Sequence, residues 1–214
     1  MSQERKDANK LDGALKGAPE DAGRVAVAGG RYRILGGRFH RMEKNLPIVD
    51  QDSGRLVGVT NPRDMTYIHS YGGEAPFFEA LSEGRLLASR CDDDACEANG
   101  SVFLPFRIHC PDCLSKCTAV DVTGRPSTVY SFMVTERTGA FNTLPKPVKF
   151  VNVQVEGACT ILMSVLAVGD PEIGMRVVPV FRVDDPTFTI LDLAWVPEGT
   201  PAERLPPGFR FGAG

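Results

Sequence analysis

The chain has 214 residues, which is enough for one large or two small domains. Hydrophobic residues make up 43% and charged residues 24% of the chain, a composition that excludes wholesale disorder and fibrous repeats. Lys and Arg number 24 against 27 Asp and Glu, a formal charge of −3, so no net basic field attracts nucleic acid or an anionic membrane. The longest apolar run, Ile161 to Val168, is far shorter than the ~20 residues of a membrane-spanning helix.

The first ten residues, MSQERKDANK, contain no apolar signal core, so we expect the chain to remain in the cytoplasm. Residues 1 to 24 show no apolar periodicity and predict a flexible tail. Residues 25 to 73 are rich in turn signals and predict an irregular extension with short strands, among them Arg31 to Leu35 and Leu56 to Thr60.

The clearest helix signal spans Glu74 to Glu83 and opens the next segment, residues 74 to 118. Pro76 suits a first helical turn, and Gly84 is a typical stop. The large apolar side chains of this segment form one stripe, made of Phe77, Phe78 and Leu81.

Residues 119 to 196 have the pattern of a β domain with no intervening helices, which predicts a small closed barrel or a sandwich. The five expected strands are Val129 to Thr135, Val148 to Val155, Thr160 to Val168, Met175 to Val183 and Phe188 to Trp195. In the second strand, valines alternate with polar residues, which indicates a sheet with one wet face. Because Pro179 cannot donate a ladder hydrogen bond, the fourth strand is predicted to be an edge strand or bulged.

The last segment, residues 197 to 214, contains too much Pro and Gly to continue the barrel. Two aromatic residues in it, Phe209 and Phe211, would be unusual to leave in water. We therefore expect a surface that a partner protein covers.

Two cysteine pairs form the strongest motif of the sequence. Four residues separate Cys91 from Cys96, two separate Cys110 from Cys113, and thirteen lie between the pairs. This is a zinc-ribbon spacing, because two short Cys hairpins bring four thiolates to the corners of a tetrahedron. Zn²⁺ held by four protein ligands has no open position for water, so the predicted role of the metal is structural.

Several alternatives to this zinc site remain open. In a reducing cytoplasm the six cysteines are poor candidates for disulfides, and some could be free or buried thiols. Cys117 lies four residues past Cys113 and could replace a ligand, whereas Cys159 opens an apolar strand and is predicted to be a core residue. An iron electron carrier is less favoured, because the first Cys pair is wide and contains the acidic residues Asp92 to Asp94.

Three separated segments resemble those of one known protein family. They are FFEALSEGRLLASRC, the FLPFR segment before CPDC, and VGDPEIGMRVVPVFRV, and together they cover about Pro76 to Val183. The chain resembles proteins that join an N-terminal helix and a rubredoxin-like zinc ribbon to a C-terminal OB fold, which implies a mainly β fold with a five-stranded barrel. Members of this family are non-catalytic partners of thiolases, hydroxymethylglutaryl-CoA synthase and some enoyl-CoA hydratases.

The resemblance implies a thiolase-fold catalytic subunit as partner in a hetero-oligomer, with a heterotetramer expected, and a share in binding acyl-CoA. It implies neither nucleic acid nor membrane as a partner. The wider first Cys pair and the long segment before Pro76 depart from the family pattern. That long segment resembles, more loosely, the small subunits of thiolases of anaerobic aromatic degradation.

Catalysis is expected to belong to the partner. A thiolase needs a nucleophilic Cys, a second Cys as acid or base and an activating His, whereas this chain has only three histidines. His40, His69 and His109 are each predicted to be surface or packing residues. The chain is also too short for a two-layered thiolase fold, so it has no predicted catalytic residues.

A basic run between Arg31 and Lys44 could meet the phosphates of coenzyme A or of a nucleic acid. The favoured interpretation is a solvated strand face, and Arg107 and Arg125 are further phosphate candidates. A nucleic-acid-binding zinc-ribbon and OB module is the alternative function. The net charge, the few aromatic residues and the expected polar outward face of the strands argue against it.

Overall fold

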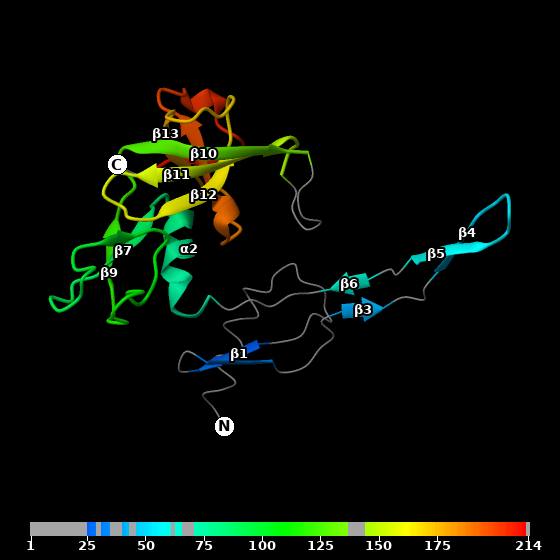
Figure 1. Ribbon diagram of the computed structural model, residues 1–214, viewed down its shortest axis with the longest axis horizontal. Helices are drawn as coiled ribbons and strands as arrows, with labels where there is room; N and C mark the ends of the chain where they lie inside the picture. The colour runs from blue at the N-terminus through cyan, green and yellow to red at the C-terminus, as the bar shows by residue number, and fades with distance from the viewer. Residues whose placement is uncertain are drawn as a thin grey trace. The chain divides into compact units, whose positions relative to one another are not determined.

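The computed structural model describes residues 25–28, 31–34, 40–42, 46–60, 63–65, 71–136 and 144–212 (Figure 1). It divides the chain into two units, residues 1–72 and 73–214. The predicted tail of residues 1–24, and with it His69, Arg38 and Lys44, lies outside the described residues. None of the helices found in these ranges is both long enough and apolar enough to cross a bilayer.

The described part of the first unit consists of paired short strands. Strand β1 (Val25–Ala28) pairs with β2 (Arg31–Ile34), β3 (His40–Met42) with β6 (Arg63–Met65), and β4 (Leu46–Val49) with β5 (Leu56–Thr60), all antiparallel. The strands predicted near residues 31–35 and 56–60 are therefore present. The β4–β5 hairpin exposes six large apolar side chains: Leu46, Ile48, Val49, Leu56, Val57 and Val59.

The second unit begins with a short 3-10 turn (Gly72–Glu74) and helix α2 (Ala75–Ser82), close to the predicted bounds. The backbone N–H of Gly84 donates to Leu81 O, and a positive φ of 77° at this glycine ends the helix. A three-stranded sheet follows, with β7 (Leu87–Arg90) between β8 (Val102–Phe103) and β9 (Thr118–Asp121).

Five strands then close into a barrel (Figure 1): β10 (Ser127–Thr135), β11 (Val148–Val155), β12 (Ile161–Leu166), β13 (Arg176–Arg182) and β14 (Leu193–Pro197). Their order is β10-β11-β12-β14-β13, and a short pairing of β13 with the start of β10 closes the ring. Strands β12 and β14 run parallel, and the other barrel pairs are antiparallel. The fold is thus mainly β, with an OB-like barrel, and the open choice between barrel and sandwich is decided for the barrel.

The structure corrects the expected edge position of β13. This strand pairs with β14 on one side, and on the other side with β10 at Arg176 and Val177 and with a further strand, β15 (Phe209–Phe211), from Val180 onward. Pro179 lies in the gap between those two pairings. The missing N–H of proline is tolerated there, because that side of the strand has no partner at this position.

The C-terminal segment, which was expected not to continue the barrel, adds the short strand β15 to β13 outside the five-stranded barrel. One strand boundary differs from the sequence prediction. The fifth barrel strand begins only at Leu193, because Thr189 caps a 3-10 turn over Ile190–Asp192 and Phe188 adopts a positive φ of 54°. The five-part division at residues 24, 73, 118 and 196 stays a prediction.

One apolar core joins helix α2, the three-stranded sheet and the barrel. Its members include Leu81 on α2, Leu86 before β7 and Leu104 after β8, together with Val153 and Trp195 of the barrel. Strand β11 alternates as predicted, with Val151, Val153 and Val155 buried. The shared core fixes the three-stranded sheet and its cysteines against the barrel.

The expected polar outward face of the barrel is found on β11 but not on its neighbours. On β10, Tyr130, Phe132 and Met133 are exposed, and on β12, Ile161 and Met163 are exposed. Because the residues of β12 alternate strictly, Ile161 and Met163 share the face opposite to buried Leu162. Met133 lies on the same face, because it pairs with Phe150 of β11, which in turn pairs with Val165 of β12. We call the three exposed residues Met133, Ile161 and Met163 the outer apolar face.

Burial along β12 gives a first prediction. Replacing buried Leu162 by Ala should lower the free energy of unfolding by about 2–5 kcal/mol, because it leaves a cavity in the core. The matched change Ile161→Ala, on the 42% exposed neighbour, should cost less than about 1 kcal/mol. Urea unfolding of the two purified variants measures both, and equal losses would contradict this assignment of faces.

Candidate metal centre

The first Cys pair lies on a turn directly after β7. The backbone N–H of Cys96 donates to Asp93 O (3.0 Å), and the N–H of Gly100 donates to Cys91 O (2.8 Å). The carboxylate of Asp93 accepts a hydrogen bond from the backbone N–H of Ala95 (3.0 Å). This inner turn takes up the four intervening residues, so the wide spacing still returns Cys96 to the side of Cys91.

The second pair, Cys110 and Cys113, forms a tighter turn. The N–H of Leu114 donates to Cys110 O (3.0 Å), and the N–H of Cys110 donates to Ser115 O (2.9 Å). The hydroxyl of Ser115 also donates to the second carboxylate oxygen of Asp93 (2.6 Å). This hydrogen bond connects the two turns directly.

The four sulfur atoms of Cys91, Cys96, Cys110 and Cys113 all lie within 4.8 Å of one another. Two of the distances are 3.7 Å, from Cys91 to Cys113, and 3.9 Å, from Cys96 to Cys110. A tetrahedral ion with metal–sulfur bonds of about 2.3 Å places its sulfur ligands about 3.8 Å apart. The arrangement therefore fits a tetrahedral metal ion, and the cluster could hold one.

Backbone N–H groups favour thiolates in this cluster, as metal binding requires. The backbone N–H of Cys113 is the main cause that lowers the pKa of Cys110 to about 7. The N–H of Ala98 donates to the sulfur of Cys96 (3.3 Å). At Cys91 the N–H of Asp93 also acts to lower the pKa, but burial and the neighbouring thiols together raise it to about 12. Four thiolates this close need a cation between them.

The remaining two cysteines lie outside the four-sulfur cluster. Cys117 is buried beside the cluster, and burial raises the pKa of its thiol. The prediction that Cys159 is a core residue is wrong: Cys159 is exposed, and its sulfur donates to Val102 O (3.0 Å). It lies in the bend that precedes β12.

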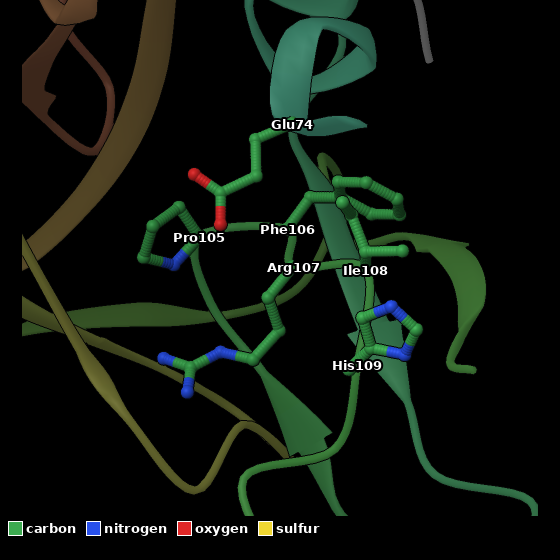
Figure 2. Close-up of a pocket in the computed structure, with 6 residues that line it drawn as sticks. All are labelled: Glu74, Pro105, Phe106, Arg107, Ile108 and His109. Atoms are coloured by element: carbon green, nitrogen blue, oxygen red, sulfur yellow. The ribbon is translucent and has the colours of Figure 1, made fainter. Parts of the chain in front are cut away.

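A cavity of about 430 Å³ lies beside the second Cys pair and contains Arg107 and His109 (Figure 2). The two side chains point to opposite sides of the chain in this view, and the carboxylate of Glu74 lies near Pro105. The guanidinium of Arg107 stacks over Phe103, 5.4 Å from the ring centre. The Nδ1 atom of His109 lies 3.0 Å from Leu114 O, so this imidazole contacts the second Cys turn.

The other candidate binding residues are scattered. Arg125 donates from Nη1 to Glu156 O (3.2 Å), at the start of the barrel. Arg31 and Arg33 lie on strand β2 and Arg41 on β3, within the first unit. His40 is also on β3. The phosphate-binding role suggested for these arginines, and the surface or packing role suggested for His40, stay predictions.

Comparisons with known proteins give structural similarities only. No protein-family model and no curated protein sequence matches the chain. A protein of unknown function from the DUF35 family of Sulfolobus solfataricus is 20% identical, with 61% of this chain and 90% of that chain covered and a TM-score of 0.45. The Ltp2-ChsH2(DUF35) aldolase is 25% identical, with coverages of 61% and 98% and a TM-score of 0.48. At these TM-scores, neither similarity assigns a family or a function.

Asp93 is the residue of this site whose role the sequence did not reveal, since it was noted only as one of the acidic residues Asp92 to Asp94 within the first Cys pair. The structure shows Asp93 half-buried, bonded to Ala95 in its own turn and to Ser115 in the other. A sequence signal exists for the first contact, because Asp commonly accepts a hydrogen bond from the N–H two residues on. The contact to Ser115 spans the fold and has no local signal.

This double contact gives a second prediction. Asp93→Ala removes both hydrogen bonds and should weaken metal binding about tenfold, as loss of a supporting residue around metal ligands commonly does. Asp112→Ala, an exposed Asp inside the other Cys pair, is the matched control and should leave metal affinity unchanged. Competition with a chromogenic chelator measures both, and equal affinities of the two variants would contradict the role of Asp93.

Proposed function

We propose that the chain is a non-catalytic, zinc-containing accessory subunit of a thiolase-type acyl-CoA enzyme. The observation that carries the proposal is the single unit of residues 73–214, in which the three-stranded sheet next to the four-sulfur cluster shares one core with an OB-like barrel. The three segments that resemble the helix, ribbon and OB family all lie in this unit. One similar structure is named as a DUF35 aldolase, but its TM-score of 0.48 carries no argument, so the proposal rests on the chain's own residues.

Zinc is the metal that suits this cluster best. Four sulfur ligands in tetrahedral arrangement select Zn²⁺ or iron among common metals. The half-buried Asp93 and the exposed Asp92 and Asp94 give the first Cys turn an acidic surface, which favours the redox-inert ion over an iron electron carrier. Because four thiolates fill the coordination sphere, the role proposed for Zn²⁺ is to hold the two Cys turns together.

The zinc site gives a third prediction. The purified wild type should contain one zinc per chain, and Cys110→Ser should lose most of this zinc and melt at a lower temperature. Cys117→Ser is the matched control, since Cys117 is also buried but lies outside the cluster, and it should keep a full equivalent. Elemental analysis measures the zinc content of the wild type and both variants, and thermal melting measures their stability. A full equivalent of zinc in Cys110→Ser would exclude this ligand set.

Exposed apolar surface supports the partner half of the proposal. The outer apolar face on β10 and β12 includes Met133 and Met163, each 55% exposed. The β4–β5 hairpin exposes a second apolar surface. An isolated two-stranded hairpin is only marginally stable in water, so contact of this surface with a partner would stabilise it. Contiguous surfaces of this kind mark protein interaction sites. Of the tail aromatics expected at such a surface, Phe211 is exposed and Phe209 is half-buried.

The partner we propose is a thiolase-fold catalytic subunit, assembled with this chain into a heterotetramer that binds acyl-CoA. The long segment before Pro76, with its loose resemblance to thiolase small subunits, makes benzoylsuccinyl-CoA thiolysis the first reaction to assay. In this arrangement the partner supplies the nucleophilic Cys and the His, while this chain stabilises the complex.

The proposal is tested by affinity purification of the tagged chain from its native cytosol, with mass spectrometry of co-purifying proteins and metal analysis of the same sample. A stoichiometric thiolase-fold protein together with zinc is the expected result. Co-purifying nucleic acid would favour a nucleic-acid-binding module, for which the exposed Tyr130 and Phe132 offer stacking surfaces. Absence of any thiolase-fold partner would overturn the proposal.

The outer apolar face gives a fourth prediction. Met163→Asp should reduce recovery of the co-expressed catalytic subunit at least about tenfold, because it places a charge in the interface. Ile173→Asp changes an equally apolar residue of 72% exposure in the loop before β13 and should leave recovery unchanged. Both variants should keep their zinc. Equal recovery with the two variants would place the interface elsewhere.

A further inference from the structure

A second cavity of about 430 Å³ lies on the side of the barrel, away from the cysteines, and we call it the barrel-side cavity. Strands β12 and β14, which pair here in parallel, contribute Val165 and Ala194 to its wall. Leu191 closes it from the loop before β14, and Phe209 from the added strand β15. Its lining is mostly apolar, and its volume falls within the range of about 300–1,000 Å³ typical of small-molecule sites.

Three cationic residues, Lys146, Lys149 and Arg182, line this apolar cavity. The charge of Lys149 is already compensated, since its Nζ donates to Gly169 O (2.6 Å) and to a carboxylate oxygen of Asp170 (2.8 Å). Lys146 is exposed at the rim. Arg182 is half-buried on β13 and forms no ion pair with any residue that the structure describes.

The Arg182 side chain is oriented by a neighbouring ring, but one of its hydrogen-bond donors has no partner among the described residues. Its guanidinium lies over the ring of Phe209, 5.3 Å from the centre, which orients the planar group by a cation–π contact. Its Nε atom is buried and has no hydrogen-bond partner within the described part of the chain. The nearest acidic residue in sequence, Asp184, is bound instead by Arg210 through both carboxylate oxygens (2.7 and 2.8 Å).

A buried donor without a partner is costly, and such a group in a native fold calls for an explanation. The Nε atom itself is closed to a ligand, but Arg182 lines the cavity and its charge has no acidic partner among the described residues. An anion in the cavity would compensate this charge through the Nη atoms, because the planar guanidinium matches carboxylate and phosphate oxygens. The apolar walls then require that the rest of the ligand be apolar. We propose that the barrel-side cavity binds a small organic anion with an apolar body, its anionic head on Arg182 and Lys146.

Two sources share this chemistry: a free organic acid, through its carboxylate, and a coenzyme A derivative, through its phosphates. The proposal holds whether or not the chain is a thiolase subunit, since it uses only residues of the barrel and of β15. Its failure and the failure of the proposed function are therefore measured separately, by ligand binding here and by partner recovery above.

The test is calorimetric titration of the purified full chain with three probes: octanoate, octylamine and coenzyme A. Octylamine has the apolar body of octanoate with the opposite charge, so it controls for binding by apolar contact alone. We expect octanoate or coenzyme A to bind and octylamine not to bind. Binding of octanoate assigns the carboxylate source, and binding of coenzyme A assigns the phosphate source.

Substitutions place the binding in this cavity. Arg182→Gln should lower the affinity for the probe about tenfold or more, which is the usual loss when a hydrogen bond to a charged group is removed. Arg176→Gln is the matched control on the same strand: Arg176 is paired with Glu198 (3.1 Å) and does not line this cavity, so affinity should stay at the wild-type value. Lys146→Gln, on the exposed rim, should weaken binding about twofold to fivefold without disturbing the core.

Thermal melting checks that each variant folds, and if Arg182→Gln does not fold, Lys146→Gln decides by itself. The proposal is overturned if neither octanoate nor coenzyme A binds the wild type, or if octylamine binds as tightly as octanoate. It is equally overturned if the folded variants of Arg182 and Lys146 bind the probe as the wild type does.

Discussion

The rest of the second unit depends on one shared apolar core. Leu81 of α2, Leu86 before β7, Leu104 after β8 and Trp195 of the barrel are all at most 1% exposed and belong to the same cluster. The segment that bears the cysteines has too few large apolar residues of its own to fold alone, so it is positioned by what it buries against the barrel. This core sets where the four sulfur atoms meet.

Within that frame, short local contacts shape the metal centre. Each Cys turn is closed by its own backbone hydrogen bonds, and Asp93 links the first turn to Ser115 of the second. Four thiols held this close repel one another once ionised, so the folded chain is arranged for a cation that it does not itself provide. The centre is thereby a structural element, set apart from the surfaces where ligands and partners are proposed to bind.

Those surfaces lie on the barrel, and the structure distinguishes two kinds. The outer apolar face on β10 and β12 is exposed and carries no charged side chain among its three residues, which suits a protein partner. The barrel-side cavity is concave and combines apolar walls with an unpaired Arg182, which suits a small anion. The β15 strand helps to form the second of these, since Phe209 both lines the cavity and orients Arg182.

The sequence by itself determined the features that depend on residues close together in the chain. The spacing of Cys91, Cys96, Cys110 and Cys113 indicated the four-sulfur cluster, the helix near α2 followed from Pro76 and Gly84, and β11 was evident from its alternating valines. Only the tertiary structure decided the closure of the barrel, the place of Pro179 between two pairings, the exposure of Cys159 and the cavity around Arg182. These features arise from pairing between segments that are distant in the chain. The register of that pairing sets which face of each strand is buried, and the residues of a single segment do not determine which distant segment it pairs with.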